Sequence, residues 1–278
     1  MSAAPEPVSS TPPLAPGLAW RRTVWLLALL PGAAARAWID GPMFAGHLAL
    51  ALGCALAVDA LCRHVRAPGP SSGAWQATAY ALLLVLCLPA SSPGWLPASG
   101  AALAVFVAQF TPDDADRPRF HPAMAALAML AAPFPERLVH TPDASGDAVV
   151  ALGYALGGLA LTGFGRVRGS IPFFLLGTAL ALALAWHLLA SATPLSSEPM
   201  ALWLLTAFFI ATEPARGCTT PRGRGLFAAG IALLGFAAQR LGSSPVAAIA
   251  AAVLLMNALA PWIDRHTEPP AWRRKAIP

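Results

Sequence analysis

Charged residues are scarce in this sequence. Asp, Glu, Lys and Arg make up 11% of its 278 residues, whereas 57% are hydrophobic. A soluble domain usually carries roughly 25% charged residues. The composition therefore argues against a soluble domain and favours a polytopic membrane protein. The formal net charge of +5 does not indicate a nucleic-acid-binding protein, because the basic residues are scattered among short segments between apolar runs.

Patterns typical of catalysis or metal binding are also missing. The sequence contains no Ser-His-Asp pattern, no phosphate-binding Gly-Lys-Ser/Thr loop and no zinc-ligand spacing. Its four cysteines lack a Cys-x-x-Cys spacing, and we interpret Cys54, Cys62, Cys87 and Cys218 as small packing residues. An iron–sulfur site would need ligands from a partner subunit. We therefore predict no catalytic residue and no metal site within this chain.

Apolar runs recur along the whole chain, separated by short segments rich in Pro, Gly and Ser. Backbone groups inside lipid must hydrogen-bond within their own segment, so such runs form helices. We predict an all-α integral membrane fold with about ten transmembrane helices, at residues 23–38, 43–62, 74–88, 95–110, 120–133, 148–164, 171–190, 200–212, 225–239 and 246–262. Residues 1–22 and 265–278 are expected to be cytoplasmic tails around a single membrane domain, residues 23–264. The first tail is expected to be disordered and not a cleavable signal peptide, because it is rich in Pro, Ser and Ala and has no basic start.

The distribution of basic residues predicts the orientation of these helices. With the amino terminus in the cytoplasm, 15 of the 18 Lys and Arg residues fall on the inner side. The outer side then keeps only Arg36, Arg137 and Arg240. This asymmetry agrees with the positive-inside rule and places both termini in the cytoplasm.

Ten helices divide into two sets of five, and an odd number per set inverts the second set. We predict two inverted repeats, at about 23–135 and 148–264. The third and eighth segments are both short and are followed by Pro-containing stretches at Pro89, Pro93, Pro214 and Pro221. Short, interrupted segments at matching places in two repeats indicate a central binding site.

Glu213 lies where the eighth apolar run ends, and it is the leading candidate for ion coupling. A carboxylate at such a position costs free energy unless it is paired with another group or takes part in the function of the protein. The hydroxyls of Thr212, Thr219 and Thr220 could add oxygen ligands for a hard cation or members of a proton relay. The alternative is a boundary carboxylate paired with Arg216 or Arg222.

Two further polar sites lie in apolar segments. Asn257 is a weaker candidate for ion coupling, and its alternative role is a hydrogen bond between helices. Asp59 precedes Arg63 by four residues, a spacing that predicts an ion pair at a helix end.

Several stretches resemble one family of membrane proteins. Residues 208–214 (Phe-Phe-Ile-Ala-Thr-Glu-Pro), 219–224 (Thr-Thr-Pro-Arg-Gly-Arg) and 252–264 carry the closest resemblance. Residues 29–34, 88–95, 120–124 and 171–172 extend it over most of the chain. Together they are similar to the D subunit of the Rnf-type electron transport complex, which is related to the B subunit of the sodium-pumping NADH:quinone reductase.

The resemblance implies a subunit of a redox-driven translocase in the bacterial inner membrane, and not a stand-alone enzyme. Such a complex couples flavin-mediated electron transfer to ion translocation. The implied partners are the other membrane subunits, the subunits that carry flavin and iron–sulfur centres, and membrane lipid. The family carries Asp at the position of Glu213.

The resemblance also implies two flavins, an FMN esterified to a Thr and a non-covalent flavin such as riboflavin. The position of the esterified Thr falls on Ala148, which has no oxygen to esterify. Thr141 and Ser145 are the alternative attachment residues. The non-covalent site would include the Phe-Asn-Pro stretch of the family, which corresponds here to residues Phe120, His121 and Pro122.

Two other functions remain open from the sequence. The chain could be a flavin-free scaffold subunit of such a complex. It could instead be a solute transporter or channel built on the same helical repeat.

Overall fold

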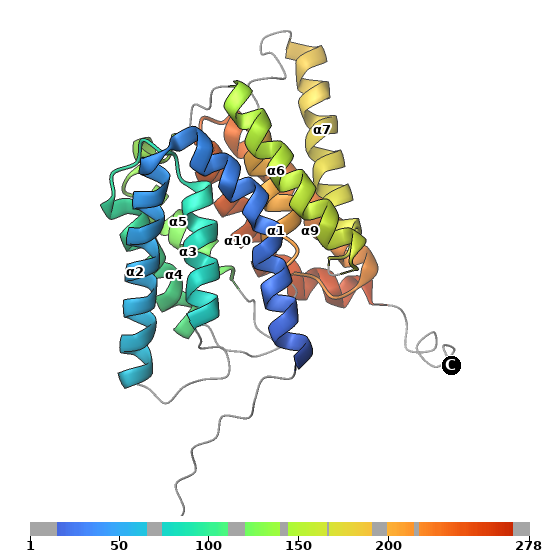
Figure 1. Cartoon of the computed structure of the whole chain (residues 1–278). Coiled ribbons are helices and arrows are strands. Elements are labelled where there is room, and N and C mark those ends of the chain that lie inside the picture. The colour runs from blue at the N-terminus through green and yellow to red at the C-terminus, as the bar shows by residue number, and fades with distance from the viewer. Residues whose placement is uncertain are drawn as a thin grey trace, which may run out of the picture.

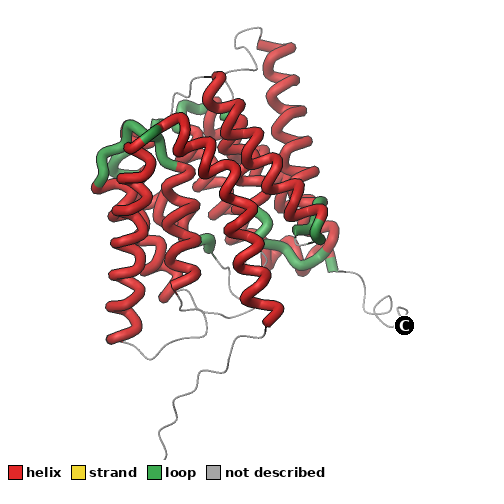
Figure 2. Tube along the Cα trace, in the orientation of Figure 1, coloured by secondary structure: helices red, strands yellow, loops and turns green. Residues whose placement is uncertain are grey.

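The structure is a computed structural model that describes residues 16–65, 74–110, 120–139, 144–165, 167–190, 199–213 and 217–268. Its regular structure in these ranges is entirely helical (Figures 1 and 2). The elements are α1 (Pro16–Asp40), α2 (Pro42–Val65), α3 (Ala74–Cys87), α4 (Trp95–Phe110), α5 (Pro122–Ala131), η1 (Pro135–Leu138), α6 (Ala144–Gly163), α7 (Ser170–Ala190), α8 (Met200–Leu205), η3 (Thr206–Ile210), α9 (Pro221–Arg240) and α10 (Pro245–Thr267). η1 is a short 3-10 helix, whereas η3 is a turn of π-helix that continues α8.

Every apolar run predicted to be helical contains a helix, and most ends agree within a few residues. The largest differences lie at the two ends of the membrane domain. α1 already begins at Pro16, seven residues before the expected start, and α10 continues to Thr267. Proline suits the first turn of a helix because its missing N–H would have no partner there.

The helices differ in length in a way that bears on the site. Among the described residues, α2, α6, α7 and α10 are long and apolar enough to cross a membrane. α5 has only 10 residues, and α8 with η3 has 11. At 1.5 Å per residue, each reaches only about half of a hydrocarbon core of about 30 Å. The ends of these short elements therefore lie inside the bundle.

The packing between helices follows a repeated pattern. α2 packs against α4, and α4 against α5; in the second half of the chain α7 packs against α9, and α9 against α10. The main contacts between the two halves join α1 to α6 and α5 to α10, which are the helices of equal rank in each half. Figure 1 shows α1 and α6 side by side.

Glycines bring α1 and α6 into backbone contact. A Cβ atom added to Gly157 would overlap the carbonyl oxygen of Ala28, and one added to Gly153 would lie 2.7 Å from the Cα atom of Gly32. Small residues four apart on one helix face allow this close approach, which is common between helices in membranes.

Large apolar side chains cover much of the outer surface. Leu61, Leu152, Leu159, Phe173 and Leu189 are each at least 60% exposed. A soluble monomer seldom exposes so much contiguous apolar surface, whereas lipid or partner subunits would cover it.

Candidate functional site

Three buried or half-buried polar side chains meet where the short helices end inside the bundle. Nε2 of His121 lies 3.2 Å from Oε2 of Glu213. The hydroxyl of Tyr80 donates a hydrogen bond to the other carboxylate oxygen of Glu213, at 3.3 Å. The rings of Tyr80 and His121 are in edge contact, with centroids 6.0 Å apart. We call Tyr80, His121 and Glu213 the inner triad.

His121 is held by the start of α5. It is the N-cap residue of that helix, and its Nδ1 atom accepts a hydrogen bond from the backbone N–H of Met124. Because Nδ1 acts as an acceptor, the neutral ring carries its proton on Nε2, the nitrogen that lies 3.2 Å from Oε2 of Glu213. His121 is 1% exposed, so this orientation is maintained by packing as well as by the cap. Pro122 occupies the first turn of α5, where it needs no partner for an N–H.

Glu213 is positioned by the π-turn that precedes it. The backbone N–H of Ala211 bonds to the carbonyl of Thr206, five residues earlier, and the helix ends directly afterwards. The hydroxyl of Thr212 donates to the carbonyl of Phe208, so that it stabilises this turn. The Glu213 side chain is 26% exposed, and it therefore lies between the interior and the surface. π-turns are rare and frequently occur at functional sites.

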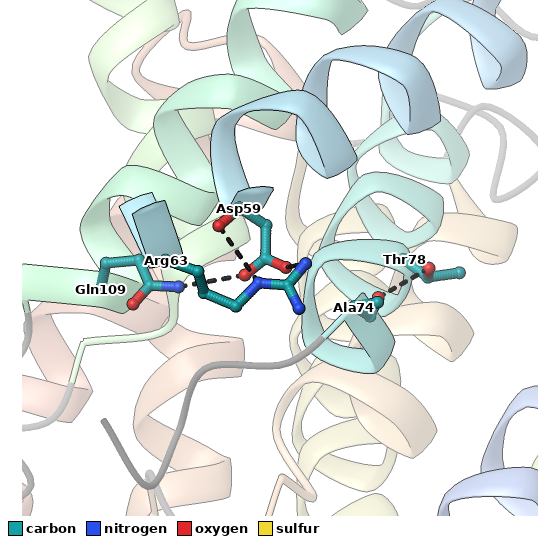
Figure 3. Close-up of polar contacts among 5 residues, drawn as sticks. All are labelled: Asp59, Arg63, Ala74, Thr78 and Gln109. Atoms are coloured by element: carbon teal, nitrogen blue, oxygen red, sulfur yellow. Dashed lines mark hydrogen bonds and ion pairs between the residues drawn. The ribbon is translucent and has the colours of Figure 1, made fainter. Parts of the chain in front are cut away.

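Asp59, Arg63 and Gln109 form a second polar cluster (Figure 3). Nη2 of Arg63 lies 2.8 Å from Oδ2 of Asp59, which confirms the ion pair predicted from their spacing. Nε2 of Gln109, on α4, donates to Oδ1 of Asp59 at 3.1 Å. Asp59 is 1% exposed, so these two partners compensate a buried carboxylate.

A cavity of about 10 Å³ lies between the second cluster and the triad. Its polar lining comes from Asp59, Gln76, Tyr80 and Gln109. A cavity of this size and polarity can hold about one water molecule. Tyr80 thus belongs to both groups, because it lines the cavity and donates to Glu213.

The structure brings together residues that the sequence alone assigned to two sites. His121 was expected to contact a flavin, and Glu213 to handle an ion, yet the two side chains are in contact. Tyr80 belongs to no motif and was not expected here, although it is one of only two tyrosines and stands in a mostly apolar helix.

The hydroxyls of Thr219 and Thr220 point to a different carboxylate. Both donate to Asp264 of α10, at 3.0 and 3.1 Å, as do their backbone N–H groups. The Thr220 hydroxyl also accepts from the backbone N–H of Gly223, which makes Thr220 the N-cap of α9. These threonines therefore join α9 to α10. Asn257 is 2% exposed on the buried face of α10.

The residues expected near a covalent flavin lie at the start of α6. Ser145 and Ala148 are exposed there, whereas Thr141 lies outside the described residues. The carboxylate of Asp147 accepts a hydrogen bond from the backbone N–H of Ala201, at 3.2 Å. Asp147 thus brings negative charge to the place where an esterified phosphate would lie, and like charges repel.

A third polar cluster lies at the far end of α1, and no motif in the sequence pointed to it. Nε of Arg36 lies 3.0 Å from Oδ2 of Asp40, and its Nη2 atom donates to the carbonyl of Leu88 at 2.9 Å. The charge distribution placed Arg36 simply on the outer side, but the residue is only 8% exposed. Arg36 and Asp40 are four residues apart, so their spacing could have predicted this ion pair, as it predicted the pair of Asp59 and Arg63.

Comparison with known proteins supports the resemblance seen in the sequence. The sequence model of the NQR2, RnfD, RnfE family matches residues 17–149 and 138–273. The D subunit of the ion-translocating oxidoreductase complex of Aeromonas hydrophila is 29% identical, over 90% of this chain and 93% of its own length. The proteins of the same name from Halorhodospira halophila and Alcanivorax borkumensis are 27% and 28% identical.

The alignment with the Aeromonas hydrophila protein spans 330 positions, which is more than the 278 residues of this chain. That relative therefore contains segments with no counterpart here. The apolar helices and the match over nearly the whole length show a multi-pass membrane protein. The chain belongs to the NQR2, RnfD, RnfE family.

Proposed function

We propose that this protein is the membrane-embedded D subunit of an ion-translocating electron transport complex of the Rnf type, in which flavin-mediated electron transfer drives ion movement. The names of its relatives support the kind of complex. The observation that carries the proposal is the contact between His121 and Glu213 at the junction of the two short helices. Ionisable side chains inside a membrane bundle are costly and usually mark an ion pathway.

In this proposal Glu213 is the group that takes up and releases the ion. Its carboxylate faces His121 and Tyr80 while a quarter of the side chain remains exposed. Tyr80 donates to one oxygen of the carboxylate and His121 lies beside the other, while the exposed portion of the side chain gives access. Thr212 supports the turn that carries it.

The residues of this chain do not fit a covalently attached FMN at the position that the family uses. Ala148 offers no hydroxyl, and Asp147 opposes a phosphate there. His121 does not fit a flavin contact either, because it is 1% exposed and its two ring nitrogens already face Met124 and Glu213. We therefore assign the flavins of the complex to partner subunits and derive no step through a flavin in this chain.

We further propose that the chain crosses a bacterial inner membrane ten times, with both termini in the cytoplasm, as two inverted five-helix repeats. The support is the packing pattern, in which α1 meets α6 and α5 meets α10. Helices of equal rank meet in this way when two repeats are related by a two-fold axis. The inner triad would then lie on the cytoplasmic side of that axis.

The Glu213→Gln variant tests the function. In inside-out membrane vesicles that contain the complex, we expect electron transfer to continue while ion uptake falls at least tenfold, because the amide cannot change charge. Glu136→Gln is the control, since Glu136 is exposed in η1. Unchanged ion uptake in the Glu213→Gln variant would show that Glu213 does not take up the ion and is only a carboxylate at the membrane boundary.

The absence of an esterifiable residue at Ala148 favours a second candidate, a flavin-free scaffold subunit. This candidate predicts equal ion movement in complexes with and without the Glu213→Gln substitution, whereas the first proposal predicts a loss. Ion movement by the purified chain without electron flow would instead indicate a transporter or channel.

A further inference from the structure

We propose that the ion handled by Glu213 is a proton, and that it reaches Glu213 from the Asp59–Arg63 pair through Tyr80. The inference rests on the proposed function, to which it adds the identity of the ion and its route. It depends on one structural feature, which is a continuous series of polar groups from the end of α2 to the interior.

The route begins at the surface end of α2. The Arg63 side chain is 42% exposed, whereas that of Asp59 is only 2% exposed. Figure 3 shows the Asp59 carboxylate between Arg63 and Gln109, close to α3. Asp59 is thus a buried acceptor that takes a proton from solvent past the Arg63 guanidinium.

The next member is the small cavity beside Asp59. Its volume of about 10 Å³ and its lining by Asp59, Gln76, Tyr80 and Gln109 suit one water molecule. A hydrated metal cation is too large for this space. A bare cation would also have to share Asp59 with the Arg63 guanidinium, which already lies 2.8 Å from the carboxylate and would repel it. The cavity therefore suits a neutral water molecule that relays a proton from Asp59 to Tyr80.

Tyr80 connects the cavity to the triad. Tyr80 lines the cavity, and its hydroxyl donates to Oε1 of Glu213 at 3.3 Å. When the water gives a proton to the Tyr80 oxygen, the original hydroxyl proton passes to Glu213. One O–H bond forms and one breaks at Tyr80, which ends neutral, while Glu213 gains the single proton. The water, which has lost one proton to Tyr80, then takes up the proton that Asp59 carries.

His121 positions the Glu213 carboxylate, which accepts the proton. Its Nε2 atom lies 3.2 Å from Oε2 of Glu213, so the imidazole holds the carboxylate beside the Tyr80 hydroxyl. The ionisable groups along the route are thus Asp59, Arg63, Tyr80, His121 and Glu213, and they come from α2, α3, the start of α5 and the end of η3.

The test compares the two tyrosines of the chain. Tyr80 and Tyr154 are 3% and 1% exposed, but the Tyr154 hydroxyl has no hydrogen-bond partner among the described residues. In inside-out vesicles containing the complex, a luminal pH dye reports proton uptake during electron flow from reduced methyl viologen. We expect uptake without sodium, a loss of at least tenfold in Tyr80→Phe, and no change in Tyr154→Phe. Phenylalanine keeps the ring packing of each tyrosine, so both variants should assemble.

Asp59→Asn provides a second variant, which keeps an acceptor for Gln109 but cannot release a proton, and it should also lose uptake. Full uptake in both Tyr80→Phe and Asp59→Asn would overturn the route. Charge movement that requires sodium and leaves luminal pH unchanged would show that the transported ion is not a proton. The proposed function would then still stand. Electron flow with no ion movement in the wild-type complex would overturn the proposed function itself.

Discussion

His121 and Glu213 lie 3.2 Å apart, although 92 positions separate them in the sequence. The contact joins the N-cap residue of α5 to a residue that lies just after the end of η3. These are the two shortest apolar segments of the described chain, one from each half. A broken helix exposes unpaired backbone groups at its end, and such ends inside a membrane bundle are where transport proteins place their sites.

His121 caps α5 and also contacts Glu213, and substitutions can separate these two roles. His121→Asn keeps an acceptor for the Met124 N–H, but its side chain is shorter and moves away from Glu213. His121→Ala removes both interactions. We expect the alanine variant to lose about 1 kcal/mol more stability than the asparagine variant, which is the usual value of an N-cap.

Thermal unfolding of the purified protein in detergent measures this difference, and vesicle assays measure ion uptake. Uptake should fall in both variants, because neither provides the imidazole N–H beside Glu213. Equal stability of the two variants would show that the cap contributes nothing. Normal uptake in the asparagine variant would show that the contact between His121 and Glu213 is dispensable.

The contact between α1 and α6 gives a prediction about stability. In Gly157→Ala the added methyl group would overlap the carbonyl of Ala28, which is backbone and cannot rotate away. We expect a loss of about 3 kcal/mol or a failure to fold, as is typical of overpacking. Gly163→Ala, in the same helix but with open space around it, should be neutral or slightly stabilising. Expression level and thermal unfolding in detergent compare the two variants, and equal behaviour would contradict the backbone contact.

Cys218, between η3 and α9, should resist alkylation. Burial raises the pKa of its thiol to about 12, and the nearby Asp264 carboxylate adds to the effect. At pH 8 only about one thiol in ten thousand would be ionised, and only the thiolate reacts. The raised pKa also means that the folded state loses stability as the pH rises above the pKa of the unfolded thiol.

A variant with Cys54, Cys62 and Cys87 replaced by Ala leaves Cys218 as the single thiol. Its reaction with N-ethylmaleimide at pH 8 should be at least about a hundredfold slower in the folded protein than after denaturation. Asp264→Asn should speed the reaction, because it removes a negative charge that disfavours the thiolate. Rapid labelling of the folded protein would mean that the thiol is accessible and ionised.

Composition and local pattern were enough to predict the helical elements and the class of protein. Scarce charge and recurring apolar runs require helices that satisfy their own backbone hydrogen bonds, and each predicted segment contains one. The motifs around Glu213 and Phe120 were sufficient to indicate the family. Local spacing also predicted the Asp59–Arg63 pair, because residues four apart on a helix share a face.

Which polar side chains act together became visible only in three dimensions. The fold joins His121 to Glu213, introduces Tyr80 between them and Asp59, and assigns Thr219 and Thr220 to Asp264. The physical reason is that these contacts link segments far apart in the chain, where spacing carries no information. Their partners depend on how α3 and the ends of α5 and η3 pack together. Apolar periodicity in a helix predicts which face is buried, but it does not predict which neighbouring helix covers that face.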